Sequence, residues 1–279
     1  MKLSERRMQA LSLIDIQNVS LDILTEVHQF CKANDIQYSL AYGTLLGAIR
    51  HKGFIPWDDD IDIFMTRPNY EKFARLFKPQ EGIAFISEKD SYIALPRVCD
   101  VKRTVFQSTL PWAPNKDLGI WIDIFPIDGV EDDRAAFKKR MIENARLYNL
   151  QLAVRRAMPN LSTKLSLRQN IKQLCRKIRY FNWTPRKIND KILDQCKEYP
   201  FATASHCSQL VSTTTLDKQF YDKKIFDEYT EVEFEGRMFS AIRDWDTILK
   251  LNYGSYMQLP PEEERVQHSC DHTKFYWKE

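Results

Sequence analysis

Four aspartates fall within five consecutive positions of the stretch GFIPWDDDIDIF, residues 53–64: Asp58, Asp59, Asp60 and Asp62. Carboxylates this close repel one another, and burying one of them without a partner costs several kcal/mol. The apolar residues that follow directly indicate a buried strand. We therefore expect a cation at this place. The alternative is a solvated acidic turn, because turns favour aspartate.

Alternation along a strand would put Asp60 and Asp62 on one face, about 7 Å apart, with Ile61 and Ile63 facing the core. Oxygen ligands favour Mg²⁺ or Mn²⁺ over zinc, and Mg²⁺ usually binds through one or two carboxylates plus substrate phosphates. A lone carboxylate, Asp123, interrupts the apolar stretch GIWIDIFP. It is the candidate third ligand, from a neighbouring strand, of a two-metal site for phosphoryl chemistry. The alternative is an aspartate that caps a turn at the end of its strand.

A phosphate site is predicted upstream, in AYGTLLGAIR. A strand that ends in Gly-Thr and passes at once into a helix points backbone N–H groups and the positive end of the helix at an anion. Gly43 would allow close approach of the backbone, and Thr44 would offer a hydroxyl to phosphate. The alternative is an ordinary N-terminal helix cap.

These residues need elements to position them. Apolar spacing predicts a helix over 12–33, and IQYSLAYG predicts a strand that reaches Gly43. A short helix in TLLGAIRHKG, a half-acidic strand in IPWDDDIDIFM and a turn at Pro68 and Asn69 follow. Later strands are expected in GIAFIS, YIALPRVCDV, TVFQST and GIWIDIFPIDGV, with mostly helix over 134–200. The pattern predicts an α+β fold, with a mixed β-sheet core, flanking helices and a basic helical elaboration.

Composition narrows the class of protein. The chain has 279 residues, 43% of them apolar, which is enough for a substantial core. No run of about 18 apolar residues is present, and the N-terminal residues lack the apolar region of a secretory signal. The six cysteines form no CxxC pair, as is typical of reduced thiols. These features predict a cytoplasmic protein.

Basic residues are concentrated in the middle of the chain. Residues 134–191 contain 16 Lys or Arg and two acids, a net charge of +14, whereas the whole chain carries +3. Such asymmetry indicates an anionic partner. Within 165–183, apolar residues recur at helical spacing among cations, which predicts peripheral contact with an anionic membrane at its inner face. The alternatives are packing on the catalytic core and a clamp for an anionic glycan. The stripe consists of Ile171, Leu174, Cys175, Ile178 and Phe181.

A Gly-Thr turn, an acid-x-acid strand and a later third acid together resemble the nucleotidyltransferase superfamily. The stretch YGTLLGAIRHKGFIPWDDDIDIFMTRPNYEKF resembles the signature block of the LicD family, which includes bacterial phosphocholine transferases and fukutin-type relatives. Further agreement lies in WIDIFPIDGV and YGSYMQLPPEEER, so the resemblance runs from about residue 14 to 265. We expect a nucleotidyltransferase-like core over 1–133, a basic helical region over 134–215 and a C-terminal segment over 216–279 that completes the domain.

The resemblance implies Asp60, Asp62 and Asp123 as catalytic ligands of Mg²⁺ or Mn²⁺. Gly43 and Thr44 match the phosphate-contacting turn. The resemblance further implies metal-dependent transfer of phosphocholine from CDP-choline to a sugar hydroxyl, with release of CMP. The acceptor would be a cell-surface glycan, free or lipid-linked, such as a teichoic acid or lipopolysaccharide precursor, and no nucleic acid is involved. Ribitol or glycerol phosphate transfer from a CDP donor, and a non-catalytic glycan-binding scaffold, remain alternatives.

Other residues near the block have two interpretations each. Asp58 and Asp59 match acidic positions of the signature and are expected at the substrate. Arg50, His51 and Lys52 follow the short helix, where they would neutralise a departing phosphate or form an exposed basic loop. Trp57 would be a core anchor or a wall that holds a quaternary ammonium. The stretch HSCDH suggests zinc at His268, Cys270 and His272, or a surface tail, since a structural zinc site needs a fourth ligand.

Overall fold

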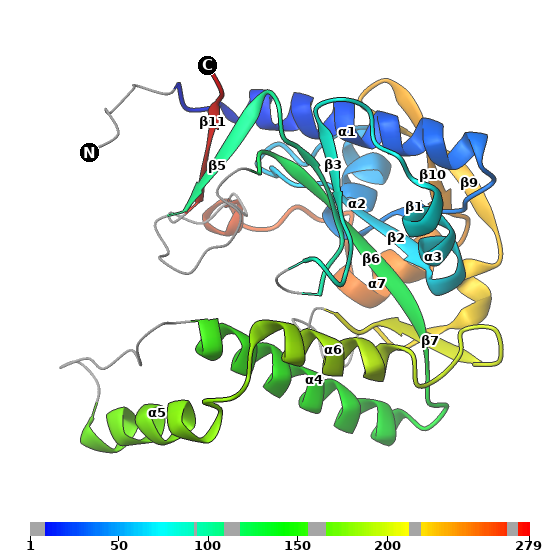
Figure 1. Cartoon of the computed structure of the whole chain (residues 1–279). Helices are drawn as coiled ribbons and strands as arrows, with labels where there is room; N and C mark the ends of the chain where they lie inside the picture. Colours follow the sequence, from blue (N-terminus) through cyan, green and yellow to red (C-terminus); the bar gives the residue numbers. More distant parts are fainter. Residues whose placement is uncertain (1–8, 92–93, 109–117, 156–165, 212–218, 267–272) are drawn as a thin grey trace.

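The computed structural model describes residues 9–91, 94–108, 118–155, 166–211, 219–266 and 273–279. Its centre is a mixed seven-stranded sheet (Figure 1). Five strands run in the order β1 (Ser39–Leu40), β2 (Asp62–Thr66), β6 (Trp121–Val130), β4 (Arg97–Asp100) and β3 (Ile83–Ile86). β7 (His206–Gln209) continues the sheet from the far end of β6 and pairs with β8 (Tyr221–Asp222). Strands β2 and β6 are parallel, and the other pairs are antiparallel.

Helices flank this sheet. α1 (Leu13–Ala33) begins with a capping box between Ser12 and Asp15 and buries one apolar face, which includes Ile23 and Val27. In Figure 1, α1 lies above the sheet, whereas α4 (Arg134–Arg155), α5 (Leu167–Arg179) and α6 (Pro185–Cys196) lie below it. The shorter helices are α2 (Tyr42–His51), α3 (Arg67–Leu76) and α7 (Trp245–Tyr253), with 3₁₀ turns η1 (Lys223–Phe226) and η2 (Glu262–Glu264).

Two antiparallel ribbons complete the molecule. β9 (Tyr229–Phe234) and β10 (Arg237–Ile242) form a hairpin with positive φ at Glu235 and Gly236, as a two-residue hairpin turn requires. β5 (Thr104–Ser108) pairs with β11 (Thr273–Trp277), which brings the C-terminal strand beside the middle of the chain. The α+β class with a mixed sheet and flanking helices is therefore confirmed.

Three local expectations differ from the structure. The strand expected to reach Gly43 ends at Leu40, because α2 already begins at Tyr42. The half-acidic strand begins only at Asp62, because Pro56 and Trp57 form a turn in which the Asp58 N–H donates to the Ile55 carbonyl over 2.8 Å. The turn expected at Pro68 and Asn69 is the first turn of α3 instead. Proline is well tolerated there, since the first N–H groups of a helix have no intrahelical acceptor.

A buried ion cluster ties the start of α3, directly after β2, to β6 at the end away from the aspartates. The Arg67 guanidinium donates to both carboxylate oxygens of Asp128, over 2.5 and 2.8 Å, and to Glu88 over 2.7 Å. All three side chains are buried. These carboxylates raise the pKa of Arg67, despite its burial. Each buried charge therefore has a bonded partner, as stability requires.

Candidate active site

Parallel pairing of β2 and β6 sets Asp62 directly beside Asp123. The Asp123 N–H donates to the Ile61 carbonyl over 2.9 Å, which fixes this register. Ile61 and Ile63 are fully buried, so the apolar half of the alternation faces the core as the sequence predicted. The third acid thus comes from the neighbouring strand, while its role as a metal ligand stays a prediction.

Four carboxylates share this end of the sheet. Burial raises the pKa of Asp62 well above its ordinary value, and repulsion from Asp60, Asp123 and Asp58 adds to the effect. Arg97 offsets only part of it. Burial also raises the pKa of Asp58, whose side chain is hydrogen-bonded to that of Asp60. Asp59, next to them, is buried as well. Arg97 brings one positive charge to these carboxylates, so the cluster can carry more negative charge than this guanidinium balances.

These residues fit a hard divalent cation in charge and donor type. The Oδ1 atom of Asp58 is buried and has no hydrogen-bond partner, which is costly for a carboxylate oxygen in the absence of a cation. Within the described ranges, however, no three acidic, histidine or cysteine side chains are already arranged as a metal-binding group. Asp123 Oδ1 accepts a hydrogen bond of 2.6 Å from Arg97. A cation at Asp123 would therefore lie beside this guanidinium or replace it as the partner of Oδ1.

Sequence reasoning missed Arg97. This buried residue lies opposite Asp123 in the antiparallel pairing of β4 and β6, and its guanidinium stacks 4.5 Å from the centroid of the Trp121 ring. The indole N–H of Trp121 donates to Asp123 Oδ2 over 3.3 Å. Arg97 thus brings a fixed positive charge to the carboxylates. The signal was present in YIALPRVCDV, where a single arginine interrupts an apolar strand.

The N-terminus of α2 reaches the same carboxylates. Its N-cap residue, Ala41, has no side-chain acceptor, and the Ala41 N–H donates to the Asp62 carbonyl over 2.9 Å. A Cβ atom at Gly43 would lie only 2.6 Å from Asp58 Oδ2, so any side chain here would displace the Asp58 carboxylate. The Thr44 hydroxyl accepts a hydrogen bond of 2.9 Å from the Asp62 N–H. The helix dipole therefore points its positive end at the acids and at any phosphate bound there.

Gly43→Ala is expected to lower turnover more than stability. The added methyl group would displace the Asp58 carboxylate, whose side chain can rotate away while the backbone stays in place. Gly47→Ala, in the same helix, is the matched control, because its methyl group would lie 2.5 Å from the backbone oxygen of Gly53 and would lower the melting temperature instead. Equal losses of turnover per folded molecule in the two variants would contradict the assignment of Gly43 to the site.

Thr44→Val should affect both the site and the fold. The hydroxyl already holds the Asp62 backbone, so its loss leaves a buried N–H without an acceptor and should lower the free energy of unfolding by about 2 kcal/mol. Turnover should fall as Asp62 shifts. Thr44→Ser keeps the hydroxyl and should behave like the wild type in urea unfolding and in kinetics. Unchanged stability in Thr44→Val would mean that this hydrogen bond contributes nothing.

The other predicted residues lie apart from the carboxylates or against other groups. Arg50, His51 and Lys52 stand at the opposite end of α2, about 13 Å along the helix from its N-terminus. Arg50 donates to the Tyr256 carbonyl over 2.8 Å and to His51 over 2.9 Å, which ties α2 to the segment after α7. Their role at a leaving phosphate stays a prediction.

Trp57 is half-buried against the core, and the Arg265 guanidinium lies 5.4 Å from its ring centroid. The C-terminal stretch of the signature, PPEEER, thus contributes a cation to the neighbourhood of the aspartates. The proposed zinc ligands His268, Cys270 and His272 lie outside the described residues.

Two tyrosines that the sequence analysis did not single out lie near the acids. Burial raises the pKa of Tyr42, and the charge of Asp62 contributes to this shift. The charge of Asp62 also acts on Tyr253, whose side chain is 42% exposed. The Tyr42 hydroxyl accepts a hydrogen bond of 2.9 Å from Gln219. Tyr253 is the last residue of α7, so three distant parts of the chain supply polar or aromatic groups around one carboxylate cluster.

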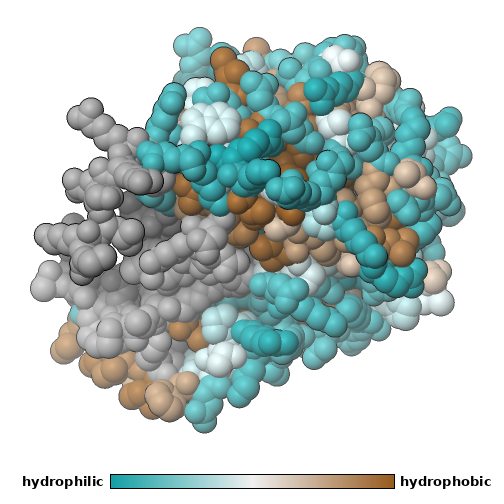
Figure 2. Space-filling view, turned by 45° about the horizontal axis from the view of Figure 1, so that its top comes forward, coloured by the Kyte–Doolittle hydropathy of each residue, from teal (hydrophilic) through white to brown (hydrophobic). Residues whose placement is uncertain are grey.

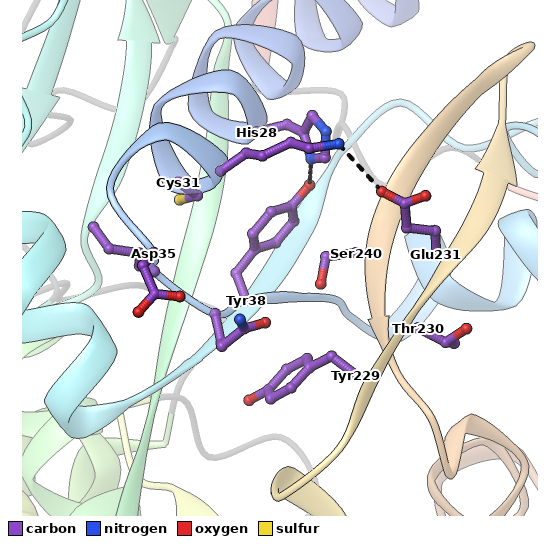
Figure 3. Close-up of a pocket in the computed structure, with 11 residues that line it drawn as sticks. His28, Cys31, Asp35, Tyr38, Tyr229, Thr230, Glu231 and Ser240 are labelled. Atoms are coloured by element: carbon purple, nitrogen blue, oxygen red, sulfur yellow. Dashed lines mark hydrogen bonds and ion pairs between the residues drawn. The ribbon is translucent and has the colours of Figure 1, made fainter.

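A separate pocket of about 280 Å³ lies between the end of α1 and the β9–β10 hairpin (Figure 3). In it, His28 Nδ1 and the Tyr38 hydroxyl are 2.8 Å apart, and Lys32 pairs with Glu231 over 3.6 Å. Burial lowers the pKa of His28. The residues that line this pocket include none of the predicted site residues, so the carboxylate cluster remains the candidate active site.

Comparisons with known proteins show which family the chain resembles. A family model described as "LicD/FKTN/FKRP, nucleotidyltransferase domain" matches residues 35–151, which contain all four clustered aspartates and Arg97. The chain is 30% identical over 266 residues to the lipopolysaccharide cholinephosphotransferase LicD of Haemophilus influenzae, covering 94% of this chain and 97% of that protein. An uncharacterized protein of Rickettsia typhi is 39% identical over 99 residues, 35% of this chain and 32% of its own length.

Proposed function

Since the chain belongs to the LicD family and is a transferase, we propose that it moves phosphocholine from CDP-choline to a sugar hydroxyl of a lipopolysaccharide precursor. The observation that carries this proposal is the carboxylate cluster at the paired starts of β2 and β6, facing the N-terminus of α2. The name and near-complete coverage of the Haemophilus relative support phosphocholine and a lipopolysaccharide acceptor. A teichoic acid precursor is the alternative acceptor.

In the proposed reaction, the acceptor hydroxyl attacks the β-phosphorus of CDP-choline, the bond to the bridging oxygen breaks, and CMP leaves. Mg²⁺ or Mn²⁺, held by Asp60, Asp62 and Asp123, would polarise the phosphoryl oxygens. Asp58 is the candidate acceptor for the hydroxyl proton, because its pKa is raised and its Oδ1 atom has no partner. Arg97 and the N–H groups at the start of α2 would bind phosphoryl oxygens and stabilise the charge that develops on them.

The proposed location is the cytoplasm. All five described cysteines are free thiols, and four of them are buried. Burial raises the pKa of Cys31 to about 12, so this thiol stays protonated and unreactive. Such cysteines fit a reducing compartment.

Donor identity can be tested by competition. Purified protein with Mg²⁺ and a lipopolysaccharide acceptor that lacks phosphocholine would receive CDP-choline, CDP-ribitol or CDP-glycerol, and mass spectrometry would report the group added. We expect kcat/KM for CDP-choline to exceed the others at least tenfold. A preference for another donor would show that choline is not the alcohol transferred. The assignment of the protein as a phospho-alcohol transferase would still stand. Absence of transfer from all three donors would favour the glycan-binding scaffold.

A further inference from the structure

Helix α5 carries an apolar stripe that faces solvent. Large apolar residues recur at spacings of three and four along it and just beyond it, and each is between 46% and 83% exposed. The stripe consists of Leu167, Ile171, Leu174, Ile178 and Phe181. A helix that packed on the catalytic core would bury such a face, so the stripe is left without a partner among the described residues.

The placement of α5 agrees with this exposure. In Figure 1, α5 lies at the lower edge of the molecule, beyond α4 and α6 and away from the sheet. Figure 2 shows apolar atoms gathered at the lower left, where α5 lies. By contrast, α6 buries its own apolar residues, including Ile188, Ile192 and Leu193. No helix of the described ranges is long and apolar enough to cross a bilayer.

The charged residues of α5 and of the sequence on both sides of it are all basic. Residues 144–189 contain no acid, and the 13 residues of α5 contain five cations: Arg168, Lys172, Arg176, Lys177 and Arg179. Helical periodicity places Arg168 on one flank of the stripe and Arg179 slightly farther round the same side. Arg168 and Arg179 are exposed. An apolar face bordered by cations complements an apolar layer beneath a negative surface.

We propose that α5 lies in the interface of an anionic bilayer, with its apolar stripe in the acyl boundary and its cations among the lipid phosphates. A second protein would need an apolar groove lined with acids, whereas an anionic membrane supplies both features everywhere on its surface. This inference rests on the proposed function in one respect: the membrane contact would bring the active site to a lipid-linked acceptor. The docking surface itself rests on the exposure and charge of α5.

Vesicle co-sedimentation tests the proposal with the full chain. We expect the wild type to bind vesicles of phosphatidylglycerol and phosphatidylethanolamine, to ignore phosphatidylcholine vesicles, and to lose binding at high salt. Ile178→Glu should lower the partition coefficient at least tenfold. Ile14→Glu is the matched control, because Ile14 is 68% exposed and Ile178 is 69% exposed, but Ile14 lies in α1. Arg168→Gln and Arg179→Gln should each lower binding about fivefold.

Transfer to a soluble, delipidated acceptor separates this inference from the proposed function. The α5 variants should keep that activity and lose only the advantage seen with acceptor embedded in vesicles. Equal binding of wild type and Ile178→Glu, or indifference to anionic lipid, would overturn the membrane proposal and leave the enzyme intact. So would a dimer of the wild type that Ile178→Glu dissociates, since the stripe would then be an interface between two copies.

Discussion

Asp62→Asn is expected to abolish transfer, with a loss in kcat of about 10³-fold or more. The change preserves shape but removes the charge at the centre of the cluster, where Asp60, Asp123 and Asp58 converge. Loss of a single electrostatic contact to a reacting group typically costs about 10² to 10³ in rate, and here a proposed metal ligand is lost as well. Steady-state release of CMP measures the effect.

The same variant should be more stable than the wild type in the absence of divalent cations. The folded wild type holds Asp62 with a raised pKa and therefore binds more protons than the unfolded chain. Its stability consequently falls as the pH rises from the ordinary aspartate value, about 3.9, through the raised value. Asparagine does not titrate. The melting temperature of Asp62→Asn minus that of the wild type should then increase with pH in EDTA, and Mg²⁺ should raise only the wild-type value.

A stable Asp62→Asn protein with normal turnover would contradict the assignment of the active site. If Asp62→Asn melted well below the wild type in EDTA, Asp62 would stabilise the fold in the absence of a cation. That result would contradict the claim that its burial and the repulsion from the other aspartates destabilise the fold. The two readouts are independent, so each can fail alone.

Asp128→Asn should produce the opposite pattern. Asp128 is a fully buried aspartate of β6, and it is bonded twice to Arg67. Removing one member of a buried ion pair leaves the other charge without compensation, which costs about 3 kcal/mol or more. Glu88 still pairs with Arg67 and reduces this free-energy cost, but it does not replace the bidentate contact. Urea unfolding should report the destabilisation, while the folded fraction keeps its turnover.

The exposed pair between Arg243 and Glu228 is the control for this prediction. Its side chains are 67% and 70% exposed and 3.1 Å apart, so Arg243→Met should cost less than about 1 kcal/mol. If Asp128→Asn cost as little as Arg243→Met, the buried cluster would not be holding the start of α3 to β6. A loss of turnover in folded Asp128→Asn would instead connect the far end of β6 to the chemistry.

Much of the site was predictable because it depends on short sequence separations and strand alternation. The burial of Ile61 and Ile63 followed from period two, and the short helix expected in TLLGAIRHKG is present as α2, which begins two residues earlier at Tyr42. Asp123 was expected on a neighbouring strand because it is a lone acid in an apolar stretch, and it lies on β6 directly beside Asp62. The α+β class followed from the order of strand and helix patterns.

The remaining features depend on register and on tertiary contacts, which a single sequence does not encode locally. Arg97 reaches Asp123 only because β4 pairs antiparallel with β6 at that register. Thr44 was expected to bond phosphate through its hydroxyl, yet that hydroxyl also anchors the Asp62 backbone. Arg50 is turned toward carbonyl groups more than 200 positions away in the chain. The proline turn at Pro56 shortened β2, because the local N–H and carbonyl bond each other instead of a neighbouring strand.

Chelator-sensitive release of CMP is the most direct test of the carboxylate cluster as a metal-dependent transferase site. Purified wild type and Asp62→Asn would be incubated with CDP-choline and a lipopolysaccharide acceptor, in Mg²⁺ and in EDTA, and both CMP and acceptor-bound phosphocholine would be quantified. We predict equal amounts of the two products from the wild type in Mg²⁺, none in EDTA, and none from folded Asp62→Asn. Transfer that continues in EDTA, or in Asp62→Asn, would contradict the assignment.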